Sequence, residues 1–170
     1  MNLQLALLPR RISIVPMKLI PINRGRFVIV DDEDYDRMME RRWTAVGPKG
    51  YAFRQTGPRA SRKNVWMHRV ICNPPEGMDV DHINMDRLDN RRENLRPATR
   101  SQNFFNKGKQ SNNHSGHKGV FWEKSCDRWR VQIKANGIRR HIGVFRDIAD
   151  AVAAYAKAAA EFHGEFARVA

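Results

Sequence analysis

A polar stretch in the middle of the chain separates its apolar residues into two groups. The segment NKGKQSNNHSGHKG, from Asn106 to Gly119, has no aliphatic side chain and no Phe, Trp or Tyr. It is rich in Asn, Ser, Gly and Lys, which is typical of a loop or linker. Since the whole chain has 170 residues, we expect two small modules, each with a core of its own.

The expected module boundaries follow these changes in composition. Residues 1–16 are predicted to be an N-terminal extension, because the sequence reads like a fresh beginning at Met17. Residues 17–108 are predicted to form the first module and residues 109–117 the linker. Residues 118–170 are predicted to form the second module. Helical and strand-like patterns occur in both modules, so the predicted fold class is α+β.

The charge balance points to a polyanionic partner. Lys and Arg number 31 against 18 Asp and Glu, which gives a formal net charge of +13 and an isoelectric point near 10.5. Such an imbalance is typical of nucleic-acid binding, although a solvated basic surface without a partner is the alternative. Because the basic residues are interleaved with aromatic ones, nucleic acid is the favoured interpretation.

The cysteines and the apolar runs argue against several other classes of protein. Cys72 and Cys126 are far apart and form no CxxC pair, against a zinc knuckle or a disulfide framework. No apolar run approaches the roughly 18 residues of a membrane span. The start, MNLQLALLPRR, has no basic region before its apolar run, against a secretory signal. We therefore expect no membrane partner and a cytoplasmic location.

The first module is predicted to begin with a short strand, a helix and a basic hairpin. The helix, roughly Glu33–Arg41, follows a strand at Phe27–Val30 and is expected to bury Tyr35, Met38 and Met39. Three further strands are expected around Trp43–Val46, Tyr51–Arg54 and Asn64–Met67. Their basic residues could lie along phosphates or only protect a solvated edge. The candidates for DNA contact are Arg54, Arg62 and Lys63.

The stretch VDHINMDRLDNRRENLRPATRSQNFFN combines one histidine with several amides and arginines. Val80–Ile83 and Leu95–Ala98 suit two strands. Thr99 with Gln102 fits a capping box, so a helix is expected to begin there and to carry Asn103 in its early turns. The predicted order is therefore strand, loop, strand, helix.

These residue types fit the hydrolysis of a phosphodiester. His82 can accept a proton from water near neutral pH. Asp81 and Asn103 supply oxygen ligands for a hard divalent cation, Mg²⁺ or Mn²⁺, which neutralises charge on the phosphate. Asn94 can brace the loop by bonding backbone near His82. Phosphate contacts are expected from Arg91, Arg92, Arg96 and Arg100.

Two points stay open in this interpretation. Neighbours on a regular strand point to opposite faces, so the strand must end or twist at Asp81 and His82, or the phosphate must lie between them. The alternative to a catalytic site is a polar loop in which Asp81, Asn90 and Asn94 only make turns.

At these residues the chain resembles the HNH homing-type endonucleases of phages and mobile introns. The matching segments are MHRVI, VDHIN, DNRRENLRPAT and SQNFFN. The resemblance implies a ββα-metal fold over about residues 80–106 and a location in the host cell of a phage or mobile element. It implies that His82 is the general base, Asp81 and Asn103 bind metal, and Asn94 braces the loop, an H-N-N version of the motif.

Two nearby residues are interpreted as lying outside the catalytic set. Asn106 is a second candidate amide, although a helix-surface role is favoured. His68, within MHRVI, is interpreted as a packing residue because it is distant from the polar cluster in sequence.

Beyond the linker, three strand patterns precede one helix. The strands are KGVFWE, RWRVQIKAN and IRRHIGVF, with the hairpin signal Asn136-Gly137 between the last two. The helix RDIADAVAAYAKAAAEFHGEF can be capped by Asp147 and ended by Gly164. From about residue 115 to 167 the chain resembles the AP2 DNA-binding domain. That resemblance implies a three-stranded antiparallel sheet packed on one helix, with the sheet in the major groove.

Alternation along the second strand separates a binding face from a core face. Trp129, Val131 and Ile133 are expected to meet the helix, which leaves the opposite face for DNA. The expected binding residues are Arg130, Gln132 and Lys134, with Lys118, Trp122, Arg140 and His141 as companions. Trp122 could equally belong to the core.

The combined prediction is a sequence-targeted DNA endonuclease that hydrolyses phosphodiester bonds by a metal-assisted histidine mechanism. The N-terminal module would cut double-stranded DNA and the tethered C-terminal module would hold it. A monomer would favour nicking, whereas a homodimer could cut both strands. The alternatives are an inactive DNA-binding transcriptional regulator and a structural RNA-binding protein.

Overall fold

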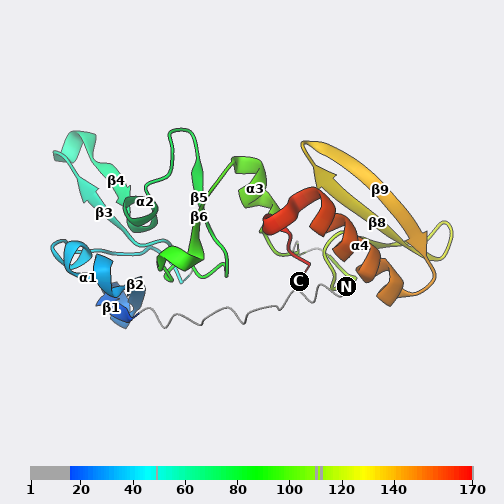
Figure 1. Cartoon of the computed structure of the whole chain (residues 1–170), viewed down its shortest axis with the longest axis horizontal. Coiled ribbons are helices and arrows are strands. Elements are labelled where there is room, and N and C mark those ends of the chain that lie inside the picture. Colours follow the sequence, from blue (N-terminus) through cyan, green and yellow to red (C-terminus); the bar gives the residue numbers. More distant parts are fainter. Residues whose placement is uncertain (1–15, 49, 110, 112, 170) are drawn as a thin grey trace, which may run out of the picture.

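The computed structural model of the chain describes residues 16–48, 50–109, 111 and 113–169. Figure 1 shows small sheets and helices at one end, helix α3 in the middle, and a larger sheet with a long helix at the other end. The predicted N-terminal extension lies outside the described residues, except for its last position. Within the described part of the chain, no helix is long and apolar enough to cross a membrane.

The N-terminal module begins with two hairpins, each followed by a helix. Strands β1 (Met17–Pro21) and β2 (Phe27–Asp31) pair antiparallel and lead into α1 (Asp32–Met39). Strands β3 (Phe53–Thr56) and β4 (Lys63–Trp66) pair antiparallel and lead into α2 (Met67–Cys72). The strand expected around Trp43–Val46 is reduced to one bridge between Thr44 and Phe53, so that prediction is wrong.

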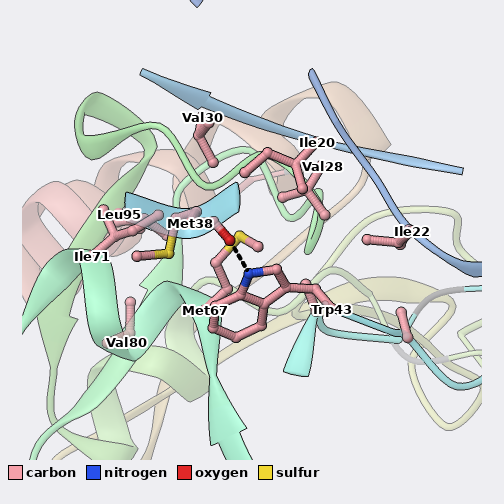
Figure 2. Close-up of a cluster of buried hydrophobic side chains, with 12 residues drawn as sticks. Ile20, Ile22, Val28, Val30, Met38, Trp43, Met67, Ile71, Val80 and Leu95 are labelled. Atoms are coloured by element: carbon pink, nitrogen blue, oxygen red, sulfur yellow. Dashed lines mark hydrogen bonds between the residues drawn. The ribbon is translucent and has the colours of Figure 1, made fainter. Parts of the chain in front are cut away.

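The core of this module joins both hairpins to the central strands. Trp43 is buried and its indole nitrogen donates to the Met38 carbonyl at 2.7 Å (Figure 2). Met38 is buried as expected, but Met39 is 42% exposed, because the short helix turns only one face inward. The remaining large members of the cluster are Ile20, Ile22, Val28, Val30, Met67, Ile71, Val80 and Leu95.

The central segment has the predicted order of strand, loop, strand and helix. Strand β5 (Asp79–His82) pairs antiparallel with β6 (Leu95–Ala98), and α3 (Arg100–Phe105) follows. A single turn of 3-10 helix, η3 (Arg92–Asn94), precedes β6. Thr99 and Gln102 form the reciprocal capping box that starts α3. Strand β5 ends at His82, which is one of the two geometries that the sequence left open.

The C-terminal module contains the expected three strands and one helix. Strands β7 (Val120–Glu123), β8 (Arg128–Ala135) and β9 (Ile138–Phe145) form one antiparallel sheet in that order. Helix α4 (Ile148–His163) packs on it over a core that includes Val131 and Tyr155. Asp147 caps α4 by accepting from the Ala149 N–H at 2.7 Å. The resemblance to AP2 domains stays a prediction.

A last turn of 3-10 helix, η4 (Gly164–Phe166), follows α4 directly. Phe166 forms a small buried cluster with Ala98 of β6 and Phe105 of α3. The end of the C-terminal module therefore packs against the helix of the central segment.

Candidate functional site

His82, the last residue of β5, lies in a buried aromatic environment. Its side chain is 4% exposed, and its ring centroid lies 5.6 Å from that of Tyr51 and 5.3 Å from that of His68. Its Nε2 lies 2.9 Å from Oδ1 of Asn90, which is fully buried. An amide oxygen only accepts, so Nε2 carries the proton and Nδ1 keeps its lone pair. Burial lowers the pKa of His82, although the bond to Asn90 acts to raise it, and this favours a neutral ring able to accept a proton.

His68 is buried, as its interpretation as a packing residue requires, but it is not distant from the site. It is 8% exposed, and burial, with the neighbouring His82 and Arg69, lowers its pKa to about 3. A neutral imidazole therefore packs against the ring of His82. The sequence does not indicate that His68 lies beside His82, because α2 and β5 are brought together only by the hydrophobic core.

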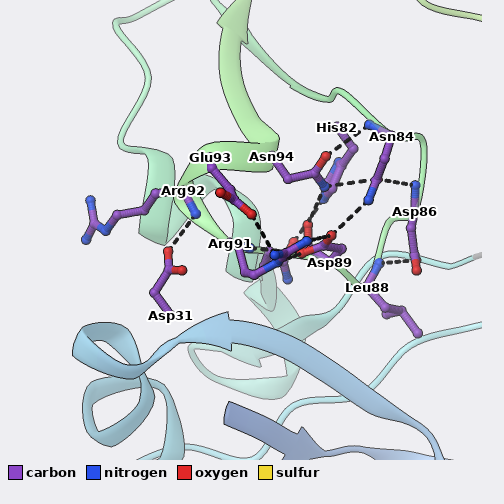
Figure 3. Close-up of polar contacts among 11 residues, drawn as sticks. Asp31, His82, Asn84, Asp86, Leu88, Asp89, Arg91, Arg92, Glu93 and Asn94 are labelled. Atoms are coloured by element: carbon purple, nitrogen blue, oxygen red, sulfur yellow. Dashed lines mark hydrogen bonds and ion pairs between the residues drawn. The ribbon is translucent and has the colours of Figure 1, made fainter. Parts of the chain in front are cut away.

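Asn94 braces the loop that follows His82 (Figure 3). Its Oδ1 accepts from the Asn84 backbone N–H at 2.9 Å. Its Nδ2 donates to Asn84 Oδ1 at 3.0 Å and to the Asp89 carbonyl at 2.7 Å. The backbone N–H of Ile83 donates to the Asn94 carbonyl at 2.9 Å. Both ends of the loop are thus attached to one buried side chain, and the role of Asn94 in catalysis stays a prediction.

Asp81 is buried and both of its carboxylate oxygens accept hydrogen bonds. Arg96 donates to Oδ2 through Nε at 3.0 Å and through Nη2 at 2.9 Å. Asn106 donates to Oδ1 through Nδ2 at 2.9 Å, and the same nitrogen donates to the His82 carbonyl at 2.8 Å. Because both of these partners can only accept, the nitrogen end of the Asn106 amide must face the strand.

Asn106 is 6% exposed, so the favoured helix-surface role is wrong. It follows α3 as its C-terminal cap and closes over β5. The sequence could have indicated this position of Asn106, because it lies three positions after Asn103 and therefore near the same helix face.

Asn103 is half-buried in α3 and is held there by the bond from its backbone N–H to the Thr99 carbonyl at 2.9 Å. Its side chain has no hydrogen-bond partner among the residues that the structure describes. Nor do the described residues include a group of three or more His, Cys, Asp or Glu side chains that could hold a metal. A cation at this site would therefore depend on Asp81 together with amide oxygens.

Three arginines predicted to contact phosphate are paired with carboxylates. Arg91 contacts Asp89 at 2.8 Å and Glu93 at 2.6 Å (Figure 3). Arg96 is paired with Asp81, and its side chain is only 14% exposed. These pairs position the loop and the strand, and their contact with phosphate stays a prediction.

Arg92 is tied to the N-terminal hairpin and helix. Its backbone N–H donates to Asp31 at 2.7 Å, and its guanidinium donates to Asp34 at 2.8 and 2.9 Å. Asp31, the residue before α1, therefore accepts from the central segment and makes no side-chain cap bond. Arg100 is exposed in the first turn of α3 and has no carboxylate partner among the described residues.

The basic hairpin presents two of its three predicted DNA contacts to solvent. Arg62 and Lys63 are exposed beside the β3–β4 turn. Arg54 is half-buried, with its guanidinium 5.7 Å from the centroid of the Trp43 ring.

The predicted DNA-binding residues of the C-terminal module lie on both faces of its sheet. Residues directly opposite each other in an antiparallel pair share a face. His141 lies opposite Gln132, so it joins the face of Arg130, Gln132 and Lys134 as predicted. Phe121 and Arg139, which the sequence analysis did not select, lie opposite Arg130 and Lys134 on this outer face.

The structure does not place Trp122 and Arg140 on that outer face. Trp122 lies opposite Trp129 with ring centroids 4.9 Å apart, on the side of α4. Arg140 lies opposite Ile133, and its guanidinium is 5.2 Å from the ring centroid of Phe162 in α4. A register shift between Val131 and Gln132 alters the pairing with β9, and the sequence gives no sign of its position.

Lys118 connects the two modules. Its Nζ donates to the Phe105 carbonyl at 2.5 Å and to the Lys107 carbonyl at 2.7 Å. Burial, with repulsion from Arg168, lowers its pKa to about 8. The chain thus uses Lys118 to bind the carbonyl end of α3.

A cleft of about 800 Å³ has walls from α3 and from the outer face of the sheet. Its lining combines aromatic and basic side chains, including Phe104, Lys107, Phe121, Arg130, Lys134 and Arg139. Phe104 is 48% exposed and Phe121 is 40% exposed. This combination suits a polyanion that carries stacking groups.

Comparison with known proteins finds a matching family and similar viral proteins. Residues 65–104 match the family described as HNH endonuclease. Protein 3.8 of Escherichia phage T7 is 33% identical over 111 residues, covering 65% of this chain and 91% of that protein. The uncharacterized HNH endonuclease L560 of Acanthamoeba polyphaga mimivirus is 30% identical over 156 residues, covering 91% of this chain and 80% of that protein. No solved structure matches the chain.

Proposed function

Because the chain belongs to the HNH endonuclease family, we propose that it hydrolyses phosphodiester bonds of double-stranded DNA at selected sites. His82 is the general base in this proposal. The observation that carries it is the environment of this ring, which is 4% exposed and held through Nε2 by Asn90, and whose burial lowers its pKa. Action inside an infected host cell is part of the proposal, supported by the phage and viral relatives.

The chain's own residues orient water and the scissile phosphate. Asn90 fixes the imidazole so that its Nδ1 lone pair takes a proton from the attacking water. Asn94 holds the loop after His82 in one conformation, which keeps the base in place as the water loses its proton. Arg100 and the exposed residues of the basic hairpin are placed on the surface, where they can contact the flanking phosphates.

The donor set fits a divalent cation of the hard class. Asp81 offers a buried carboxylate, and Asn103 offers an amide with no hydrogen-bond partner among the described side chains. Mg²⁺ and Mn²⁺ accept such oxygen ligands and leave positions for water and phosphate. When bound, the cation would neutralise charge developing on the phosphate and on the leaving 3′ oxygen. Asn106 would orient Asp81 and would not bind the cation itself, because its amide nitrogen donates to Asp81 Oδ1.

Selection of the DNA site is assigned to the C-terminal sheet. Its outer face carries Arg130, Gln132, Lys134, Arg139 and His141, and the cleft runs from this face to α3. DNA held on the sheet would therefore approach the helix that carries Asn103. A monomer with one such site would nick one strand, and a homodimer would cut both.

Incubation with supercoiled plasmid and Mg²⁺ or Mn²⁺ tests this proposal. We expect nicking by the native protein and none by His82→Ala, with duplex binding retained. Asn103→Ala should also lose cleavage and retain binding. If the native protein cuts nothing while binding duplex DNA, the regulator alternative replaces the nuclease. Preference for labelled RNA over duplex DNA at matched salt would instead favour the RNA-binding alternative.

A further inference from the structure

The last turn of the chain reaches the residues around Asp81. Phe166 in η4 is 4% exposed and packs with Ala98 and Phe105. The ring of His163, at the end of α4, stacks on Phe105 with centroids 3.8 Å apart and planes inclined by 10°. Figure 1 shows the end of α4 beside α3. Two aromatic contacts thus hold this turn against the N-terminal module.

Arg96 joins this turn to the carboxylate of Asp81. Its Nη1 donates to the Glu165 carbonyl at 2.7 Å, and its guanidinium lies 3.7 Å from the centroid of the Phe166 ring. Its other edge, Nε and Nη2, donates to Asp81 Oδ2. Because the guanidinium is planar and its donors have fixed directions, contacts with Glu165 and Phe166 also fix the edge that faces Asp81.

Asp81 is therefore held at both of its carboxylate oxygens. Asn106 holds Oδ1, and Arg96, held in turn by η4, holds Oδ2. Groups that orient a metal-ligating carboxylate commonly change metal affinity by about 10–100-fold when they are replaced.

We propose that Gly164–Phe166 is a positioning element of the nuclease site. It holds Arg96 in the orientation that presents Asp81 to the divalent cation. The C-terminal module would then do more than bind DNA, since its last turn determines how well the N-terminal module binds metal. This inference rests on the proposed role of Asp81 as a metal ligand.

Mn²⁺ binding to the full-length protein without DNA tests the inference independently of cleavage. The free ion is measured by electron paramagnetic resonance for the native protein, Phe166→Leu and Phe166→Tyr. Leu keeps an apolar side chain but loses the aromatic face over Arg96, whereas Tyr keeps that face. We expect Phe166→Leu to weaken Mn²⁺ binding about tenfold and Phe166→Tyr to bind like the native protein. Phe162→Leu is the matched control, because Phe162 packs in the C-terminal core, and it should leave Mn²⁺ binding unchanged.

The outcomes distinguish failure of the proposed metal site from failure of the positioning role of η4. If Asp81→Ala binds Mn²⁺ as well as the native protein does, the proposed metal site is wrong. If Asp81→Ala loses binding while Phe166→Leu keeps the native affinity, the metal site stands and the positioning role of η4 is refuted. Tighter binding by Phe166→Leu would mean that Arg96 competes with the cation, and it would also refute the role. Should Phe166→Leu and Phe162→Leu weaken binding equally, general loss of packing would explain the effect and the inference would fail.

Discussion

Acid should destabilise this protein through His68, and the size of the effect follows from its burial. The pKa of His68 falls from 6.5 to about 3, chiefly because burial penalises the charged ring. At pH values between these two, the unfolded chain binds a proton that the folded chain does not, so stability falls as pH falls. At about 1.36 kcal/mol per pH unit, the loss between pH 7 and pH 4 is about 3 kcal/mol for this one side chain.

Urea unfolding curves at several pH values measure the effect in two variants. His68→Phe keeps a ring among Tyr51, Trp66 and His82, and His68→Gln does not, but neither can take up the proton. Both should flatten the pH dependence of the unfolding free energy by about 3 kcal/mol over this range. Any difference in unfolding free energy between the two variants should be independent of pH, because it reflects packing alone.

Some pH dependence should remain in both variants. Burial also lowers the pKa of His82 and His163, and these rings destabilise the fold in acid in the same direction. A curve for His68→Phe that runs parallel to the native curve from pH 7 to pH 4 would refute the reasoning. It would mean that His68, beside the proposed base, takes up a proton as readily in the folded protein as in the unfolded chain.

Two further outcomes are expected. Asn94→Ala removes three hydrogen bonds of a buried side chain, so the unfolding free energy should fall by about 3 kcal/mol, and cleavage should slow. Urea titration measures the loss, with Asn64→Ala on an exposed strand position as the control; an equal loss in both variants would contradict a bracing role. Replacement of both Arg130 and Lys134 by Ala should reduce the salt dependence of duplex binding by about two units of slope. An unchanged slope in filter-binding measurements would remove these two residues from the DNA interface.

Local patterns determined where several elements begin or turn. Thr99 and Gln102 are close in sequence and cap each other, so the start of α3 could be predicted from their spacing alone. The same holds for Asn136-Gly137, where positive backbone φ angles of 52° and 78° close the hairpin. Alternation along β8 likewise gave the faces of Arg130 and Val131. The chemistry of phosphodiester hydrolysis and the family resemblance both gave Asp81, His82, Asn94 and Asn103 as candidates, whose catalytic roles stay predictions.

Only the tertiary structure decided what the charged and amide side chains contact. Arg92 and Asp34 are separated by 58 positions, and Arg96 and the Glu165 carbonyl by 69. The residues around Arg92 and Arg96 in the sequence do not indicate these partners, because such pairs depend on the path of the chain through space. For the same reason, four arginines that are close in sequence have different partners. Arg91, Arg92 and Arg96 pair with carboxylates, whereas Arg100 has no such pair among the residues that the structure describes. Short-range hydrogen bonding and side-chain periodicity can be read from the order of residues, whereas buried charge pairing requires the folded core that brings distant strands together.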